Sequence, residues 1–311
     1  MSRWNCIREQ VEDYLETRRR LGYQLKIEGM QLLRFAHFAD RQGYHKILTI
    51  ELAVEWASTS TSKLNRARRL EMIRGLAKFC ILFEPKTQIP PKGLLGPAHR
   101  RLTPYIYTAN ELSDLMGAAI RLNNGKGLRP KTIETLLGLL ATTGLRISEA
   151  LHLTREDVCF ERNLLVVKET KFNKSRIVPL HPTTTDALKN YSWFRDKSTP
   201  STTKSDTFFV FNDGYPLNYR QALYAFQTIR RQIVWRNNRC PRIHDLRHTF
   251  ACNRLLSWYE EGIDVNNAIS MLSIYLGHAK LTDTYWYLTG IPSLMAIAAK
   301  RFEAYGEVHN G

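Results

Sequence analysis

A proline-rich stretch divides the chain and limits what can fold on either side of it. Five prolines and two glycines lie between Pro85 and Pro104. Proline lacks a backbone N–H and glycine favours turns, so this stretch forbids a long helix or a central strand. The 311 residues leave room for about two domains. We therefore expect one domain at residues 1 to 85, a linker at 86 to 107 and a second domain at 108 to 311.

Helical spacing dominates the first domain, whereas the second mixes helices with strands. Residues 4 to 42 and 48 to 84 carry apolar side chains at intervals of three and four, which predicts helices. After the prolines, Thr108 and Glu111 form a capping box that predicts a helix near 109 to 122. The segments N-L-L-V-V-K, S-R-I-V-P-L and T-F-F-V-F predict short strands. We expect a multidomain, mainly α fold with a small antiparallel β-sheet in a mixed α/β second domain.

The charge balance predicts a polyanionic partner. Lysine and arginine number 45 against 29 aspartates and glutamates, which gives a net charge of +16. Between residues 61 and 80 only Glu71 opposes a run of basic side chains, namely Lys63, Arg66, Arg68, Arg69, Arg74 and Lys78. We expect this run to form a helix face that contacts DNA phosphates. A solvated helix face is the alternative.

The sequence disfavours a membrane-spanning or secreted protein, a disulfide framework and a cysteine-bound zinc. The longest apolar runs, such as Leu136 to Thr142, are too short to span a bilayer, and the first residues contain no signal-peptide core. Five widely spaced cysteines without a C-x-x-C pair argue against a disulfide framework and a cysteine zinc site. We therefore expect a cytoplasmic, nucleoid-associated protein that makes no membrane contact.

Two segments supply basic side chains suited to a phosphate. In T-T-G-L-R-I-S-E-A-L, Glu149 follows Arg146 by three residues and can orient its guanidinium, whose planar fork matches two phosphate oxygens. The hairpin T-K-F-N-K-S-R carries Lys171, Lys174 and Arg176, and Lys171 is a candidate general acid. A surface ion pair and a solvated hairpin tip are the respective alternatives.

Two further segments supply histidines and a nucleophile. In R-I-H-D-L-R-H-T-F, His244 and His248 have the spacing of a zinc pair, but Arg247 lies between them and the Glu base of H-E-x-x-H is missing. The segment Y-L-G-H-A-K-L-T-D-T-Y-W-Y-L carries His278 and Tyr287. A tyrosine can attack phosphorus when arginines neutralise the oxyanions around it, although core packing is the commoner use.

Together these segments resemble the site of the tyrosine recombinase, or lambda-integrase, family. T-G-L-R-I-S-E, the hairpin lysine, H-D-L-R-H, L-G-H and a tyrosine nine residues later occur in the family's order. The resemblance covers residues 109 to 303 in motif and the N-terminal half in architecture. It implies a helical, SAM-like core-binding domain and a catalytic domain that close around duplex DNA. It also implies a reaction without metal, ATP or another cofactor.

The resemblance implies a role for each matching residue. Arg146 and Arg247 would clamp the scissile phosphate, and Lys171 would protonate the leaving 5′ oxygen. His244 would act as a base or hydrogen-bond donor, His278 would complete the phosphate contacts, and Tyr287 would be joined to the 3′ phosphate. The hairpin reads T-K-F-N-K where the family commonly has G-K-G-N-K, which leaves Lys174 as an alternative to Lys171. Tyr285 is likewise an alternative nucleophile.

The implied function is site-specific recombination, for integration, excision or transposition of a mobile element. A type IB topoisomerase and a non-catalytic DNA-binding regulator are the alternatives. After Pro292, an apolar stripe that includes Leu294, Ile297 and Phe302 predicts a helix at 292 to 303. Because the family commonly passes this segment to a neighbour, we expect a free monomer, a tetramer on paired duplexes and a possible need for DNA-bending proteins. Docking of this helix on its own domain is the alternative.

Overall fold

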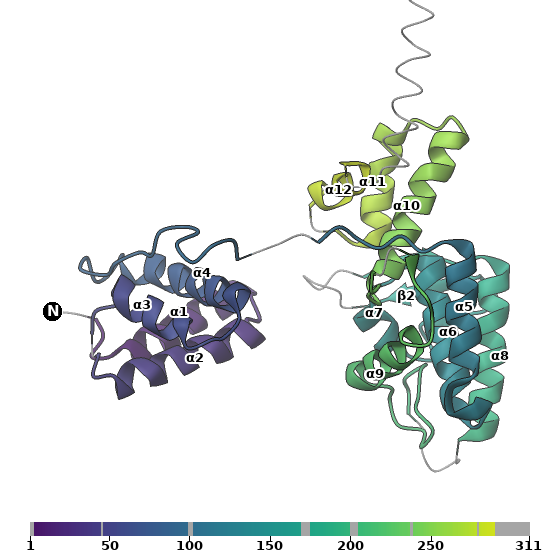
Figure 1. Cartoon of the computed structure of the whole chain (residues 1–311), viewed down its shortest axis with the longest axis horizontal. Coiled ribbons are helices and arrows are strands. Elements are labelled where there is room, and N and C mark those ends of the chain that lie inside the picture. Colours follow the sequence, from purple (N-terminus) through teal and green to yellow (C-terminus); the bar gives the residue numbers. More distant parts are fainter. Residues whose placement is uncertain are drawn as a thin grey trace, which may run out of the picture. The chain divides into compact units, whose positions relative to one another are not determined.

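The computed structural model describes residues 3–44, 46–98, 102–168, 175–199, 205–236, 239–278 and 280–289. The chain divides into two compact units, Met1–Leu102 and Thr103–Gly311. Figure 1 labels their elements. In the described residues, no helix combines the length and apolar character that a membrane crossing needs.

The N-terminal unit is a bundle of helices. Its described helices are α1 (Ile7–Arg20), α2 (Lys26–Arg41), α3 (Ile50–Ser58) and α4 (Lys63–Cys80). Phe35, Trp56 and Ile73 are fully or almost fully buried at its centre. Side-chain caps fix the starts of the last two helices, because Thr49 accepts from the N–H of Leu52 and Ser62 accepts similarly at α4.

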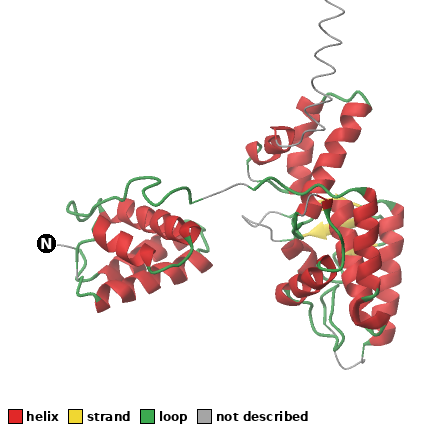
Figure 2. Ribbon diagram, in the orientation of Figure 1, coloured by secondary structure: helices red, strands yellow, loops and turns green. Residues whose placement is uncertain are grey.

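The C-terminal unit surrounds a small sheet with helices (Figure 2). Its described helices are α5 (Ala109–Ile120), the 3-10 helix η1 (Leu122–Gly125), α6 (Leu128–Thr143), α7 (Ile147–Leu151), α8 (Pro182–Ser198), α9 (Tyr219–Arg230), α10 (Asp245–Glu260), α11 (Val265–Leu276) and α12 (Thr282–Thr289). The described strands are β1 (Val158–Cys159), β2 (Leu164–Val167) and β3 (Arg176–Pro179). They form an antiparallel sheet in the order β1-β2-β3, in which Leu165 pairs with Val178.

Helix α6 is the centre of this unit. Leu136, Leu137, Leu139 and Leu140 are all at most 2% exposed, so a wide apolar face of the helix is buried, whereas Lys131, Glu134 and Thr142 lie on its more exposed side. Helices α5, α8 and α10 pack around it. Since α7 follows directly and α10 lies alongside, the end of α6 is where segments far apart in the sequence meet.

The predicted strand T-F-F-V-F does not form. Thr207 makes only an isolated bridge to Thr154, and Val210 makes another to Pro216. Consecutive side chains in this segment are buried, with Phe209 fully so, whereas a strand on a one-sided sheet would alternate. The prediction of a strand here is wrong, because a short apolar run does not distinguish a strand from a buried irregular segment.

Both ends of the predicted linker are packed. The N–H of Gln88 donates to Leu48 O at 2.9 Å within the N-terminal unit. In the C-terminal unit, Tyr105 and Tyr107 are buried, and the N–H of Tyr107 donates to Thr249 Oγ1 of α10 at 3.0 Å. The described ends of the linker therefore pack on their own units, with turns between Pro91 and Gly96.

Candidate active site

A tight turn after α6 positions Arg146. Gly144 ends that helix with a φ of +64°, and a Cβ at this position would lie 2.5 Å from the ring of Phe250. Only glycine suits both the left-handed conformation and the close approach of α10. Two residues later Arg146 caps α7, where its N–H donates to Glu149 Oε2 at 2.9 Å. The turn thus places Arg146 at the junction of α6, α7 and α10.

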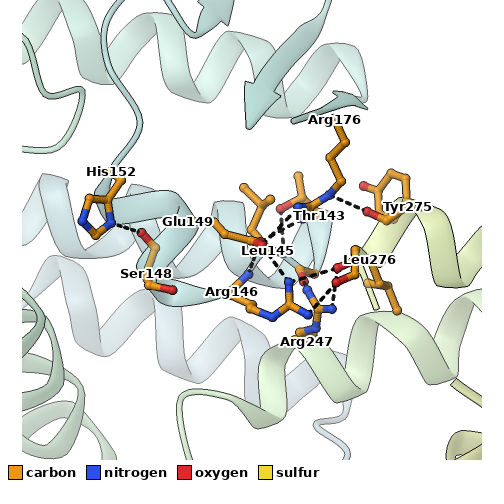
Figure 3. A network of polar contacts seen from close by, with 12 residues as sticks. Thr143, Leu145, Arg146, Ser148, Glu149, His152, Arg176, Arg247, Tyr275 and Leu276 are labelled. Atoms are coloured by element: carbon orange, nitrogen blue, oxygen red, sulfur yellow. Dashed lines mark hydrogen bonds and ion pairs between the residues drawn. The ribbon is translucent and has the colours of Figure 1, made fainter. Parts of the chain in front are cut away.

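Glu149 lies between two guanidinium groups (Figure 3). Its Oε1 accepts from Arg146 Nη1 at 2.8 Å, and Arg176 makes a two-point pair with both carboxylate oxygens at 3.0 and 2.8 Å. Burial alone would raise the pKa of Glu149, but the hydrogen bonds and charge of Arg176, followed by Arg146, lower that pKa to about 2. Glu149 is therefore ionised and holds Arg146 in a fixed orientation.

The C-terminal carbonyls of α11 bind both predicted phosphate ligands. Arg146 Nη2 donates to Gly277 O at 2.8 Å, and Arg247 Nη2 donates to Leu276 O at 2.6 Å (Figure 3). Arg247 Nη1 also donates to the carbonyl of Gly144 at 2.8 Å. The negative end of a helix dipole stabilises cations at this position. Two arginines from α7 and α10 thereby converge on one helix end.

This cluster has the electrostatics of an anion site. The guanidinium groups of Arg146, Arg176 and Arg247 oppose one carboxylate, that of Glu149. Arg247 is 2% exposed, so its charge is poorly screened by water. The side chain of Arg146 is 32% exposed and is open to a ligand from solvent. A phosphodiester, with one negative charge and two free oxygens, matches this excess of positive charge.

His244 lies beside the arginines, directly before α10. The carboxylate of Asp245 fixes the turn by accepting from the N–H and Nη2 of Arg242, both at 2.7 Å. Burial, and then the charge of Arg247, lower the pKa of His244 to about 4. Its ring packs edge-on against that of His248, with 4.8 Å between centroids. In the protein without ligand His244 is therefore neutral near pH 7, with one N–H donor and one acceptor nitrogen.

His278 directly follows the helix end that binds the arginines. Gly277 has a φ of +67°, which favours glycine, and a Cβ at this position would lie 2.9 Å from Nη1 of Arg176. Nδ1 of His278 lies 2.7 Å from Thr284 Oγ1. Burial, and then the charge of Arg247, lower the pKa of His278 to about 4. The structure thus brings four predicted site residues to one place, Arg146, His244, Arg247 and His278.

The candidate nucleophile and general acid are not placed. The backbone of Tyr287 belongs to α12, but its side chain lies outside the described residues. Lys171 and Lys174 also lie outside them, as does the predicted helix at 292–303. Tyr285, the alternative nucleophile, is 39% exposed on α12.

Arg176 occupies a different place from the hairpin tip that the sequence suggested. Its Nε donates to Tyr275 O at 2.8 Å, its other nitrogens bind Glu149, and its side chain is only 12% exposed. Arg176 therefore holds Glu149 in place, and Glu149 in turn orients Arg146; the side chain of Arg176 does not point toward solvent. Sequence reasoning missed this role, and also missed Thr284, because the partners come from different elements.

The basic residues of α4 do not share one face. Lys63, Arg68 and Lys78 are exposed, and Arg68 Nε donates to Ala98 O at 3.2 Å. Arg66 Nε donates to a main-chain carbonyl of the preceding turn at 2.6 Å, and Arg69 Nη1 donates to Trp56 O at 3.2 Å. Because each residue turns the helix by about 100°, the run is distributed around the axis. Arg66 and Arg69 satisfy carbonyls around the end of α3, which gives them a structural role as well.

Comparison with known proteins gives the family. Residues 106–290 match the phage integrase family. The integrase/recombinase y4rB of Sinorhizobium fredii (strain NBRC 101917 / NGR234) is 38% identical over 308 residues, which cover 96% of this chain and 98% of that protein. The tyrosine recombinase XerC of Chlamydia trachomatis serovar L2 is 30% identical over 234 residues, 75% of this chain and 69% of XerC.

Solved structures share the fold. The Tn1549 transposon integrase in complex with transposon right end DNA has a TM-score of 0.66 at 15% identity, covering 96% of this chain and 99% of that one. A lambda integrase tetramer bound to a Holliday junction has a TM-score of 0.59 at 16% identity, covering 89% and 78%.

The cluster of three arginines around one glutamate is suited to an anion such as a phosphodiester. The chain belongs to the phage integrase family, the family of tyrosine recombinases. It is accordingly a DNA strand-transfer enzyme. The resemblance inferred from the motifs is confirmed, and so is the mainly α fold with a small antiparallel sheet.

Proposed function

We propose that this chain cuts and rejoins DNA at specific sites through a covalent bond between Tyr287 and a 3′ phosphate. The tyrosine oxygen attacks phosphorus, the bond to the 5′ oxygen breaks, and that oxygen takes a proton from Lys171, with Lys174 as the alternative donor. The tyrosine proton passes to His244 where this residue acts as a base; a hydrogen bond donated to the phosphate is its alternative role. Attack by the 5′ hydroxyl of a second strand reverses each transfer. The phosphotyrosine conserves the energy of the phosphodiester bond, so the cycle needs neither ATP nor a metal ion.

The convergence of Arg146 and Arg247 on the end of α11 is the observation that carries this proposal. The guanidinium groups bring two positive charges to the end of α11, and the side chain of Arg146 is 32% exposed. Their N–H donors and charge can stabilise the two non-bridging oxygens as negative charge accumulates on them. Removing one such donor from a site that excludes water typically slows a reaction about 10²- to 10³-fold.

Double-stranded DNA is the proposed partner of both units. The Tn1549 integrase and lambda integrase structures are DNA complexes, which supports the same partner here. On the N-terminal unit, the exposed side chains Lys63, Arg68 and Lys78 are the strongest candidates for phosphate contacts, with Arg66, Arg69 and Arg74 beside them. A DNA-acting protein is expected where the chromosome is, so we place it in the cytoplasm, on the nucleoid.

A mobile element is the proposed substrate, and a tetramer the proposed working assembly. Similarity to an integrase/recombinase and to a transposon integrase supports integration, excision or transposition. The lambda integrase tetramer supports synapsis of two duplexes by four protomers. We propose that residues 292–303 pass between neighbours in that assembly, whereas the free protein is a monomer, and that DNA-bending proteins assist where sites must be brought together.

A nicked suicide substrate carrying the host element's ends tests the proposal. After cleavage the short fragment that bears the free 5′ hydroxyl diffuses away, so the covalent adduct accumulates, and the adduct survives denaturation. We expect an adduct with the wild-type protein, none with Tyr287→Phe, and a normal one with the matched control Tyr285→Phe. DNA affinity should be nearly equal in all three, because no cation is lost. Relaxation of plasmids that lack the ends would favour a topoisomerase. An adduct with Tyr287→Phe but none with Tyr285→Phe would identify Tyr285 as the nucleophile.

A further inference from the structure

A buried threonine of α12 bonds to the histidine of the L-G-H turn. Thr284 is fully buried in the first turn of α12, and its Oγ1 lies 2.7 Å from Nδ1 of His278. The main chain of His278 is held as well, because its N–H donates to Ser273 O of α11 at 3.0 Å. One side-chain bond therefore joins the end of α11, where Arg146 and Arg247 are bound, to the start of α12.

The direction of this bond sets which ring nitrogen of His278 carries the proton. Burial, and then the charge of Arg247, lower the pKa of His278 to about 4, so the ring is neutral at pH 7. A neutral imidazole has one N–H and one acceptor nitrogen. When the Thr284 hydroxyl donates to Nδ1, the proton lies on Nε2, which can then donate to a phosphate oxygen. The opposite tautomer would present a lone pair at Nε2, which a phosphate oxygen repels.

The same bond anchors the helix of the proposed nucleophile. The N–H of Thr284 donates to Leu281 O at 2.9 Å, so the threonine belongs to the turn that opens α12. Tyr287 follows three residues later, about 4.5 Å along the helix axis. A contact that holds Thr284 against His278 therefore sets the position of this turn relative to the arginines.

We propose that Thr284 is a positioning residue for strand cleavage, which keeps the proton of His278 on Nε2 and ties the first turn of α12 to the arginine pair. The role rests on the proposed function, since it concerns the same phosphate. Thr284 acts here through His278. Because valine has the branching and nearly the size of threonine but no hydroxyl, Thr284→Val removes the bond with little change of buried volume.

Thr284→Val on the suicide substrate tests this role. We expect covalent adduct to form about 10- to 100-fold more slowly, the range seen when the partner that orients a metal-bound histidine is removed. Thr284→Ser keeps the hydroxyl and restores most of the rate. Thr282→Val, at an exposed position in the same turn, is the matched control and reacts at the wild-type rate. DNA affinity of Thr284→Val should stay close to that of the wild type, and its unfolding temperature should fall only by what the loss of one buried hydrogen bond costs.

Nitrogen chemical shifts of His278 in the DNA-free protein supply a readout independent of cleavage. The wild type should show a protonated Nε2, and Thr284→Val should show a share of the other tautomer. The proposal is overturned by a wild-type cleavage rate in Thr284→Val, by an unchanged tautomer, or by equal losses of rate, affinity and stability that serine does not rescue. A wild-type protein that forms no adduct overturns the proposed function itself, and with it the role of Thr284 in cleavage.

Discussion

Replacement of Arg176 by methionine measures how strongly Glu149 depends on its buried partner. The two side chains are 12% and 7% exposed and share two parallel hydrogen bonds. Burial raises the pKa of Glu149, yet Arg176 and then Arg146 lower it from 4.5 to about 2. At about 1.36 kcal/mol for each pH unit, that lowering corresponds to about 3 kcal/mol. Since Arg176 supplies the larger part, we expect Arg176→Met to reduce the free energy of unfolding by about 2 to 4 kcal/mol at pH 7.

The loss has a defined pH dependence. A carboxylate whose pKa is lowered by folding stabilises the protein fully above its unfolded pKa, here 4.5, and loses this contribution as the pH falls toward 2. The gap between wild type and Arg176→Met should therefore narrow below pH 4.5, as measured by urea unfolding from pH 7 to pH 3. Arg155→Met is the control, since it breaks an ion pair with Asp196 that is 41% and 45% exposed and costs at most about 1 kcal/mol. Equal losses in the two variants would refute the reasoning.

Three further outcomes are expected. Gly22 and Gly277 both have positive φ, but only at Gly277 would a Cβ meet a guanidinium nitrogen, at 2.9 Å. Gly22→Ala should lower the free energy of unfolding by about 1 to 2 kcal/mol. Gly277→Ala should lower it clearly more and should also slow adduct formation. Equal urea midpoints in the two variants would contradict the close approach at Gly277. Because burial lowers the pKa of His244 from 6.5 to about 4, the unfolded chain takes up a proton that the folded state excludes. The unfolding temperature of the DNA-free protein should fall as the pH is lowered from 6.5 to 4, and should fall less in His244→Gln. An identical dependence of unfolding temperature on pH in the two proteins would argue against a buried neutral ring. Lys63→Ala with Arg68→Ala should reduce the slope of log affinity against log salt by about two, and an unchanged slope would exclude them as phosphate contacts.

Local features of the site could be predicted from the sequence. The capping box of Thr108 and Glu111 is confirmed, and α5 starts at the next residue, Ala109. Arg146 and Glu149, three residues apart, are bonded at 2.8 Å, as that spacing predicts. These features depend on neighbours within one turn, so the chain itself encodes them.

Contacts between distant elements could not be predicted in the same way. No periodicity indicates that Arg176 of β3 binds Glu149 of α7, or that Arg247 donates to the end of α11. Thr284 carries no motif signal beyond its place between a histidine and a tyrosine, and its burial against His278 depends on how α11 and α12 pack. Such partners are set by tertiary packing, which one sequence does not reveal.

Identification of the residue bonded to DNA tests the proposed mechanism most directly. The adduct on the suicide substrate can be digested with protease and nuclease, and the peptide that retains a nucleotide sequenced by mass spectrometry. We expect the 3′-phosphoryl group on Tyr287, within the peptide of α12, and a free 5′ hydroxyl on the released fragment. A phosphoryl group on any other residue, a 5′-linked adduct, or cleaved DNA without a covalent peptide would contradict the mechanism.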